Sequence, residues 1–257
     1  MNLKNEIKAP DFIIIGAQKC GTSTLFRNLR KHPETYLHRK KELHFFDENY
    51  SNGLEWYLKY FNDKKKPNKP FCTGEASPYY FFHPLASSRI FETFPGIKLI
   101  LLLRNPVSRA YSQYHHMKRK GRVSLSFEHC IKLEADMLKG RKEQFYADEN
   151  YSDMMYRRFS FLARSRYAEQ LTEWYKFFSK EQILIIKSED YFRDNQAIFN
   201  VVFQFLGLPP CPITLEKSHE SSGYPLMKPE TRQQLKAYFE PFNKELYQLT
   251  GRDFGWD

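Results

Sequence analysis

The sequence has few cysteines, and none of them are spaced as metal ligands usually are. The cysteines of this 257-residue chain are Cys20, Cys72, Cys130 and Cys211, with no CxxC pair among them. Zinc sites and disulfide-rich scaffolds both need cysteines at short, regular spacings. The sequence therefore predicts ordinary thiols and no bound metal.

Long apolar runs are also missing. A membrane-spanning helix needs about 20 consecutive apolar residues, and no segment approaches that length. The first twelve residues, MNLKNEIKAPDF, are charged and contain no hydrophobic stretch of signal-peptide length. We expect a soluble chain without a membrane span, located in the cytoplasm. A soluble luminal domain of a membrane-anchored Golgi enzyme is the alternative.

Acidic residues are outnumbered by basic ones. The chain has 40 Lys and Arg against 30 Asp and Glu, a formal net charge of +10. This excess favours anionic partners such as nucleotides, acidic glycans, nucleic acids or membrane surfaces. No helix-turn-helix, zinc-finger or RNP-like signature accompanies the charge, so we expect no nucleic-acid partner.

Strand-like and helix-like segments alternate along the chain. Short apolar runs typical of buried strands occur at 12–15, 71–74, 98–103 and 182–186. Helical patterns are found at 24–31, from Asn105-Pro106 onward, and at 127–138, 159–178, 195–206 and 229–249. The alternation predicts a single α/β domain with a central parallel sheet flanked by helices.

A phosphate-binding loop is predicted after the first strand. The segment IIIGAQKCGTSTL, residues 13–25, places a glycine-bounded turn between a strand and a helix. Gly16 and Gly21 have the spacing of the ATPase loop GxxxxGK[ST], but Thr22 stands where the lysine should be and Lys19 lies inside the loop. A solvated strand-to-helix turn is the alternative interpretation of this segment taken alone.

A second anion-binding segment follows the strand at 98–103. In LLLRNPVSRAYSQYHH, residues 101–116, Arg104 comes at the carboxyl end of the strand and Ser112 lies two turns into the next helix. An arginine there can hold a phosphate bidentately. No strand ends in the aspartate that magnesium-dependent kinases require, which disfavours a P-loop kinase.

Together these segments resemble the two PAPS-binding motifs of the sulfotransferase superfamily. KELHFFDENYSNGLEWY (41–57) and EPFNKELYQLTGRDFGWD (240–257) are similar to Golgi heparan sulfate sulfotransferases, especially the glucosaminyl N- and 3-O- types. The resemblance implies a P-loop-like fold. It also implies metal-free transfer of a sulfuryl group from PAPS to a hydroxyl or amine, with a carbohydrate or glycosaminoglycan-like acceptor.

The resemblance also assigns roles to residues. It implies that Lys19 stabilises the leaving phosphate, that Glu42 is the catalytic base and that His44 assists it. The expected donor-binding residues are Lys19, Cys20, Gly21, Thr22, Ser23, Thr24, Arg104, Ser112 and Gly223. The expected acceptor-side residues are Lys41, Asp47 and Glu75.

Three departures from the family pattern stand out. Ala76 occupies the place where the heparan sulfate enzymes commonly have a lysine, in GEASPYY. HESSGYPLMKP, residues 219–229, replaces a basic turn: Gly223 aligns, but Ser222 and Tyr224 are not basic. The cysteine pair of the luminal enzymes is missing as well. This favours a bacterial-type relative from a reducing compartment.

The acceptor side is less defined by the sequence. We expect the donor-binding core at about 11–115 and 180–257, and a helical acceptor-side segment at about 120–178. Basic runs at 39–41, 64–66, 118–122 and 157–166, with Tyr151, Tyr156 and Tyr167 for stacking, are consistent with an anionic-glycan groove. Solvated surface charge, and sulfation of a small-molecule or lipid hydroxyl, are the alternatives.

Overall fold

A four-stranded parallel sheet lies at the centre of the computed structural model, which describes residues 8–62, 71–214 and 223–256. The strand order is β2-β1-β3-β4, with β1 at Phe12–Gly16, β2 at Gly74–Ala76, β3 at Lys98–Leu103 and β4 at Ile183–Lys187. All of β1 and nearly all of β3 are buried, as expected for central strands covered on both faces. The predicted α/β fold with a parallel sheet is confirmed.

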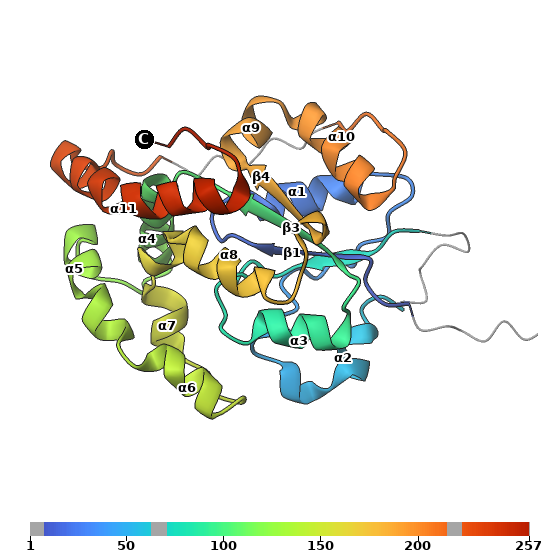
Figure 1. The fold of residues 1–257 in the computed structure, drawn as a ribbon, viewed down its shortest axis with the longest axis horizontal. Helices are drawn as coiled ribbons and strands as arrows, with labels where there is room; N and C mark the ends of the chain where they lie inside the picture. The colour runs from blue at the N-terminus through green and yellow to red at the C-terminus, as the bar shows by residue number, and fades with distance from the viewer. Residues whose placement is uncertain (1–7, 63–70, 215–222, 257) are drawn as a thin grey trace, which may run out of the picture.

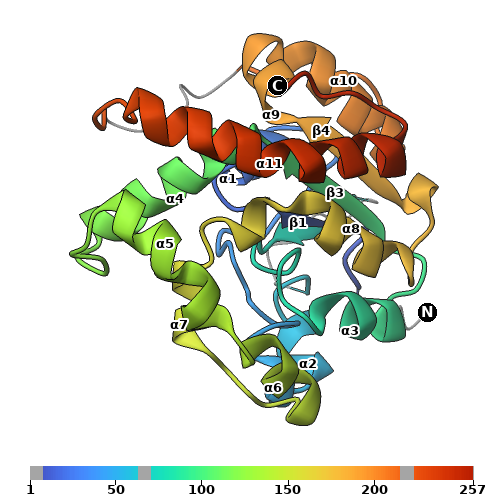
Figure 2. The ribbon, with the colours of Figure 1, turned by 60° about the vertical axis from the view of Figure 1, so that its left-hand side comes forward.

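Helices cover both faces of this sheet (Figures 1 and 2). The α-helices of the described residues are α1 (Thr22–Leu29), α2 (Leu54–Leu58), α3 (Ala86–Thr93), α4 (Pro106–Arg119), α5 (Phe127–Leu138), α6 (Arg141–Ala147), α7 (Met154–Phe159), α8 (Tyr167–Tyr175), α9 (Ser188–Arg193), α10 (Asn195–Leu206) and α11 (Pro229–Thr250). Figure 2 shows α8 and α11 in front of the sheet, with α1 behind it. Helices α5 to α7 form a group beside α4, away from the strands.

Most predicted elements lie within two residues of their expected bounds. Strand β3 and helices α5 and α10 match the predicted residues, and Asn105 caps α4 by accepting a hydrogen bond from the Ser108 amide at 3.0 Å. The strand predicted at 71–74 is displaced, because the regular pairing of β2 with β1 begins only at Gly74.

The long helix predicted at 159–178 is broken. It is replaced by the end of α7, a 3₁₀ turn at Ala163–Ser165 and helix α8. The cause is the carboxylate of Glu134 in α5, which accepts hydrogen bonds from the amides of Leu162 and Ala163 at 2.7 to 2.9 Å. A side chain from another helix therefore takes donors that a continuous helix would use itself.

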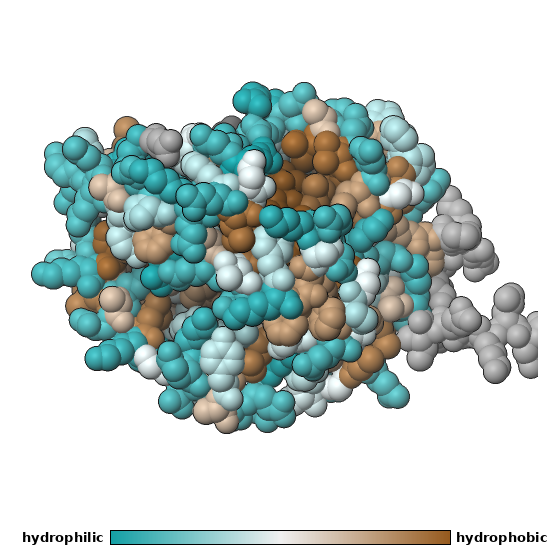
Figure 3. All heavy atoms as spheres, in the orientation of Figure 1, coloured by the Kyte–Doolittle hydropathy of each residue, from teal (hydrophilic) through white to brown (hydrophobic). Residues whose placement is uncertain are grey.

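Two clusters of buried apolar side chains hold the fold together. The larger surrounds the sheet and includes α8 through Tyr167, Leu171 and Trp174. The smaller joins α4, α5 and α11 through residues such as Phe127 and Phe239. Figure 3 shows that polar side chains cover most of one face, with apolar side chains visible between them. In the part of the chain that is described, no helix is long and apolar enough to cross a membrane.

Candidate active site

A cavity of about 1240 Å³ opens at the carboxyl ends of β1 and β3. In doubly wound sheets this is the edge at which ligands bind. The predicted residues that line it are Lys19, Gly21, Thr22, Ser23, Thr24, Lys41, Glu42, Arg104 and Ser112. Residues far apart in the sequence are thus brought to one cavity. A smaller cavity, of about 660 Å³, lies at the opposite edge of the sheet and contains none of the predicted residues.

The loop between β1 and α1 has the geometry of an anion site. Gly21 adopts φ 92°, and α1 starts at the next residue. A Cβ atom at Gly21 would lie only 2.9 Å from the Phe192 ring, so glycine fits both the conformation and the space. The first amides of α1 precede its intrahelical hydrogen bonds and are available to an anion.

Cations gather around this loop. Burial, together with the charges of Arg119 and Arg104, lowers the pKa of Lys19. The Arg104 guanidinium lies 3.4 Å from the Lys19 carbonyl oxygen, and Ser112 is almost fully buried on the wall formed by α4. Clustered positive charge beside helix amides suits a ligand that carries several phosphate charges.

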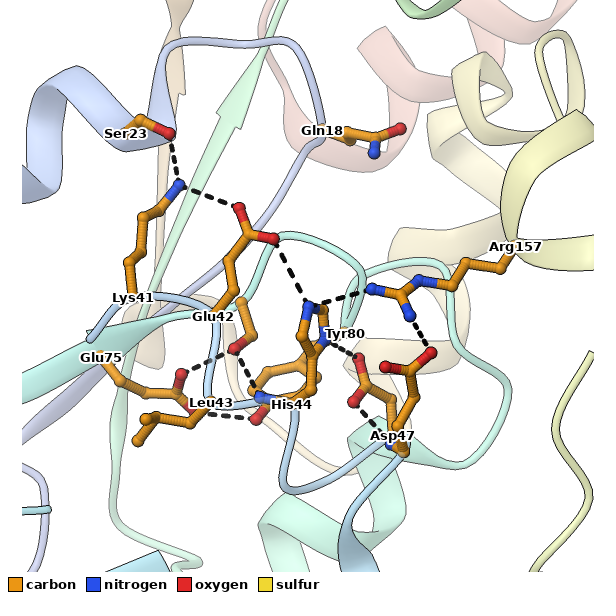
Figure 4. A network of polar contacts seen from close by, with 12 residues as sticks. Gln18, Ser23, Lys41, Glu42, Leu43, His44, Asp47, Glu75, Tyr80 and Arg157 are labelled. Atoms are coloured by element: carbon orange, nitrogen blue, oxygen red, sulfur yellow. Dashed lines mark hydrogen bonds and ion pairs between the residues drawn. The ribbon is translucent and has the colours of Figure 1, made fainter. Parts of the chain in front are cut away.

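Lys41 joins this loop to Glu42 (Figure 4). Its ammonium group donates to Ser23 Oγ at 2.5 Å and lies 3.3 Å from Glu42 Oε1. Burial would raise the pKa of Glu42, but the hydrogen bond from His44 and the charge of Lys41 outweigh it and lower the pKa to about 2. Glu42 is therefore an ionised carboxylate at the cavity wall.

Behind Glu42, His44 is oriented by a carboxylate. His44 Nδ1 lies 2.8 Å from Asp47 Oδ2, and the Asp47 side chain has no exposed surface. Burial would lower the pKa of His44, but the hydrogen bonds to Asp47 and Glu42 raise it to about 9. Asp47, expected among the acceptor-side residues, does not line the cavity, and its oxygens accept hydrogen bonds from His44 and from the Glu48 amide.

Glu75 is likewise not at the cavity. It is 1% exposed, and its carboxylate accepts hydrogen bonds from Ser77 at 2.7 Å, Tyr80 at 2.8 Å and Tyr57 at 3.2 Å. Ser77 and Tyr80 in turn accept hydrogen bonds from the amides of residues 44 and 45. The expected acceptor contact is replaced by a structural one: Glu75 holds the donors that fix the Glu42–His44 segment.

Backbone strain coincides with the predicted catalytic residues. Among the described residues, positive φ values at non-glycine positions occur at Lys19 (71°), Glu42 (58°) and His44 (53°). Such conformations cost free energy and are concentrated at functional sites. These are the three residues to which the resemblance assigned catalytic roles.

Other predicted positions lie elsewhere. The Cys20 side chain is fully buried and faces Tyr167, and burial raises the pKa of its thiol to about 11, so this side chain does not line the donor cavity. Gly223 is exposed and is not part of the cavity lining, while residues 219–222 of its loop and the basic run at 64–66 lie outside the described residues. Tyr156 and Tyr167 are core residues rather than stacking platforms.

The structure also adds residues that the sequence did not single out. Arg157 of α7 reaches the cavity, contacts His44 Nε2 at 3.1 Å and forms an ion pair with Glu48. Arg164 is buried and donates to Gln18 Oε1 at 3.1 Å, linking the phosphate loop to the segment after α7. The basic run at 157–166 hinted at these two arginines, but only tertiary structure shows which neighbours they meet.

The grouping of His44, Asp47 and Glu48 resembles a metal-ligand set in residue type. Arg157 contacts both His44 and Glu48, and so supplies the positive charge at this position. We therefore assign no metal ion to this group.

Comparison with known proteins identifies the family of the chain. The sulfotransferase domain family matches residues 9–247. The membrane-associated sulfotransferase kil1 of Dictyostelium discoideum is 33% identical over 96% of this chain and 66% of its own length. Heparan sulfate glucosamine 3-O-sulfotransferase 3B1 of Mus musculus is 31% identical over 96% of this chain and 65% of its own length.

Among solved structures, a sulfotransferase from Alicyclobacillus acidocaldarius superposes with a TM-score of 0.77 at 30% identity, covering 97% of this chain and 99% of that one. The chain spans about two thirds of the length of the two curated relatives above. The predicted relation to the heparan sulfate enzymes is confirmed. The family match and the similarity to this solved structure show that the chain belongs to the sulfotransferase family.

Proposed function

We propose that this protein transfers the sulfuryl group of PAPS to a hydroxyl or amine of an acceptor. The observation that carries the proposal is the shared cavity, in which a cationic phosphate loop and an ionised carboxylate face each other. Family membership supports PAPS as the donor.

The donor would bind along the loop and α4. We assign the 5′-phosphosulfate to Lys19, Gly21, Thr22, Ser23 and Thr24, and the 3′-phosphate to Arg104 and Ser112. The lowered pKa of Lys19 has burial as its first cause, and binding of an anion would favour its charged form. The chemistry of the site calls for no metal in this assignment, because cations of the chain surround the phosphate positions.

The transfer step divides between Glu42 and Lys19. The acceptor oxygen attacks sulfur while its proton passes to the Glu42 carboxylate. The bond between sulfur and the bridging oxygen breaks, and its electron pair stays on the phosphate, where the Lys19 ammonium stabilises the charge. Positioning and charge stabilisation of this kind account for most of the catalysis in the related phosphoryl transfers.

We propose a carbohydrate as the acceptor and, more specifically, a glycosaminoglycan-like chain. Lys41, Lys120, Arg122, Arg157 and Arg158 line the same cavity and come from three of the predicted basic runs. Several curated relatives carry names that refer to heparan sulfate. Sulfation of a small-molecule or lipid hydroxyl remains the second candidate, because the cavity itself does not require a polymer.

A reducing compartment such as the cytoplasm is part of the proposal. All four cysteines are free, and Cys20 and Cys130 are buried. The luminal alternative would place two half-buried thiols, Cys72 and Cys211, in an oxidising environment.

The test is transfer of label from radiolabelled PAPS to a heparin-derived oligosaccharide and, separately, to a small neutral alcohol. Glu42→Gln should lower the turnover number by about 10² to 10⁴, because a general base contributes about that factor. Glu143→Gln, on the exposed surface of α6, serves as the matched control and should keep wild-type turnover. Near-normal turnover of Glu42→Gln would remove Glu42 from the role of base.

A further inference from the structure

One nitrogen of His44 has two partners that cannot both be satisfied. His44 Nε2 lies 3.1 Å from Arg157 Nη2 and 3.4 Å from Glu42 Oε2. The other ring nitrogen, Nδ1, faces the buried Asp47 carboxylate at 2.8 Å and therefore carries a proton. Figure 4 shows these contacts converging on the imidazole ring.

The two partners require different protonation states of the ring. A guanidinium can only donate hydrogen bonds, so contact with Arg157 requires an unprotonated Nε2 and a neutral ring. A carboxylate can only accept, so a bond to Glu42 requires a protonated Nε2 and an imidazolium. The shorter of the two distances is the one to Arg157.

We propose that Arg157 is a positioning residue for the transfer reaction: by donating to His44 Nε2 it favours the neutral ring over the imidazolium, opposes the hydrogen bond from His44 to Glu42, and so keeps the Glu42 carboxylate available to take the acceptor proton. This inference rests on the proposed role of Glu42 as the base. It concerns a residue that does not itself exchange protons with the acceptor.

Contacts of both its side chain and its backbone fix the position of Arg157. Its side chain forms an ion pair with Glu48 and lies 5.4 Å from the centre of the Tyr79 ring. Its backbone carbonyl accepts a hydrogen bond from the buried Arg164. Because Glu48 follows Asp47 directly, the same short segment orients both the ring and the guanidinium that faces it.

The groups around the ring act on its protonation in opposite directions. The hydrogen bonds to Asp47 and Glu42 raise the pKa of His44, to about 9, and the Arg157 charge opposes this rise. Each hydrogen bond that His44 or Lys41 donates to Glu42 makes that carboxylate a weaker base. The charged or titratable groups that face or influence the ring are Glu42, Asp47, Glu48, Arg157 of α7, Glu75 of β2 and His83.

Removing the guanidinium should therefore favour the imidazolium further and strengthen its hydrogen bond to Glu42. We expect Arg157→Gln to raise the titration midpoint of His44 by about one pH unit, the size of effect that a charge at this distance produces. The measurement is two-bond ¹H–¹⁵N correlation of the imidazole nitrogens during a pH titration, with the His44 signals assigned by their loss in His44→Asn. It needs no acceptor and no turnover, so it stands even if the sulfuryl-transfer proposal fails.

The same substitution should also shift the pH dependence of turnover. In Arg157→Gln, the acid limb of the turnover profile should move upward by the same amount, so that activity recovers at higher pH. Arg157→Lys, which keeps a donor and a charge, should restore both the midpoint and the profile at least in part.

The matched control is Arg158→Gln, the next residue on α7 and in the same cavity. It removes one charge without a contact to the ring, and it should leave the His44 midpoint close to that of the wild type. A His44 midpoint unchanged in Arg157→Gln, or shifted equally in both variants, would overturn the proposal.

Discussion

At the scale of single residues, the site is arranged by side chains that never reach the cavity. Glu75 is the clearest case, because its buried carboxylate accepts hydrogen bonds from Ser77 and Tyr80. These two side chains in turn accept hydrogen bonds from the amides of His44 and Phe45. Burial raises the pKa of Glu75 to about 7. An acid with a raised pKa is a source of pH-dependent stability.

The raised pKa of Glu75 determines whether its contribution to stability grows or falls with pH. A folded-state pKa above the ordinary value of 4.5 means that the folded protein holds the proton more tightly than the unfolded chain. The stabilisation is fully present below pH 4.5 and is lost as the pH rises toward 7. The slope cannot exceed about 1.4 kcal/mol per pH unit for one group.

Glu75→Gln should remove this contribution. We expect the free energy of unfolding of the wild type to fall, relative to that of the variant, between pH 4.5 and 7. Urea unfolding of both proteins across this range measures the difference, and the similarly raised pKa of Glu134 cancels because both proteins contain it. A constant difference at all pH values would contradict the shift.

The sequence predicted the residues of the phosphate loop and Glu42 because these positions lie in short, contiguous motifs. It misplaced Glu75 and Asp47, since nothing in GEASP or HFFD indicates which way a side chain points once the strand is paired. It missed Arg157 for a different reason: its partner His44 is 113 residues away, and a basic run shows charge but no contacts.

At the scale of elements, helix α7 is a short helix that depends on its cap. Asp153 accepts hydrogen bonds from the amides of Met155 at 2.7 Å and Tyr156 at 2.9 Å, and is itself held by Arg141 and Tyr151. Six-residue helices have little stability of their own. The position of Arg157, one turn into α7, therefore depends on this cap.

Asp153→Ala should lower the free energy of unfolding by about 1 to 2 kcal/mol through loss of the cap, and should reduce turnover by releasing Arg157. Asp153→Asn keeps a good capping side chain and should lose less of both. Urea unfolding and the transfer assay, run on the same preparations, measure the two effects. Equal losses in the two variants would show that the cap is not what holds α7.

Elements with strong local signals were the predictable ones. The apolar run of β3 and the Asn-Pro start of α4 fix those elements locally, and both are found as expected. The break between α7 and α8 was not predictable, because it is made by Glu134 from α5, a tertiary contact that helical periodicity does not contain.

At the scale of the whole molecule, the +10 net charge becomes specific only through the fold. The parallel sheet places the loop after β1 and the residue after β3 at one edge, and so turns dispersed basic residues into a single cationic cavity. The central claim is that this cavity binds a nucleotide with phosphates at both the 3′ and 5′ positions.

Calorimetric titration with adenosine 3′,5′-bisphosphate, beside ATP with Mg²⁺, tests that claim most directly. We predict micromolar binding of the bisphosphate by the wild type. Arg104→Ala should bind it at least about tenfold more weakly, because a charge-assisted contact to phosphate is lost. Arg30→Ala, which removes one exposed charge from the far end of α1, should keep wild-type affinity. Absence of bisphosphate binding, with ATP and Mg²⁺ bound instead, would contradict the account and favour a kinase.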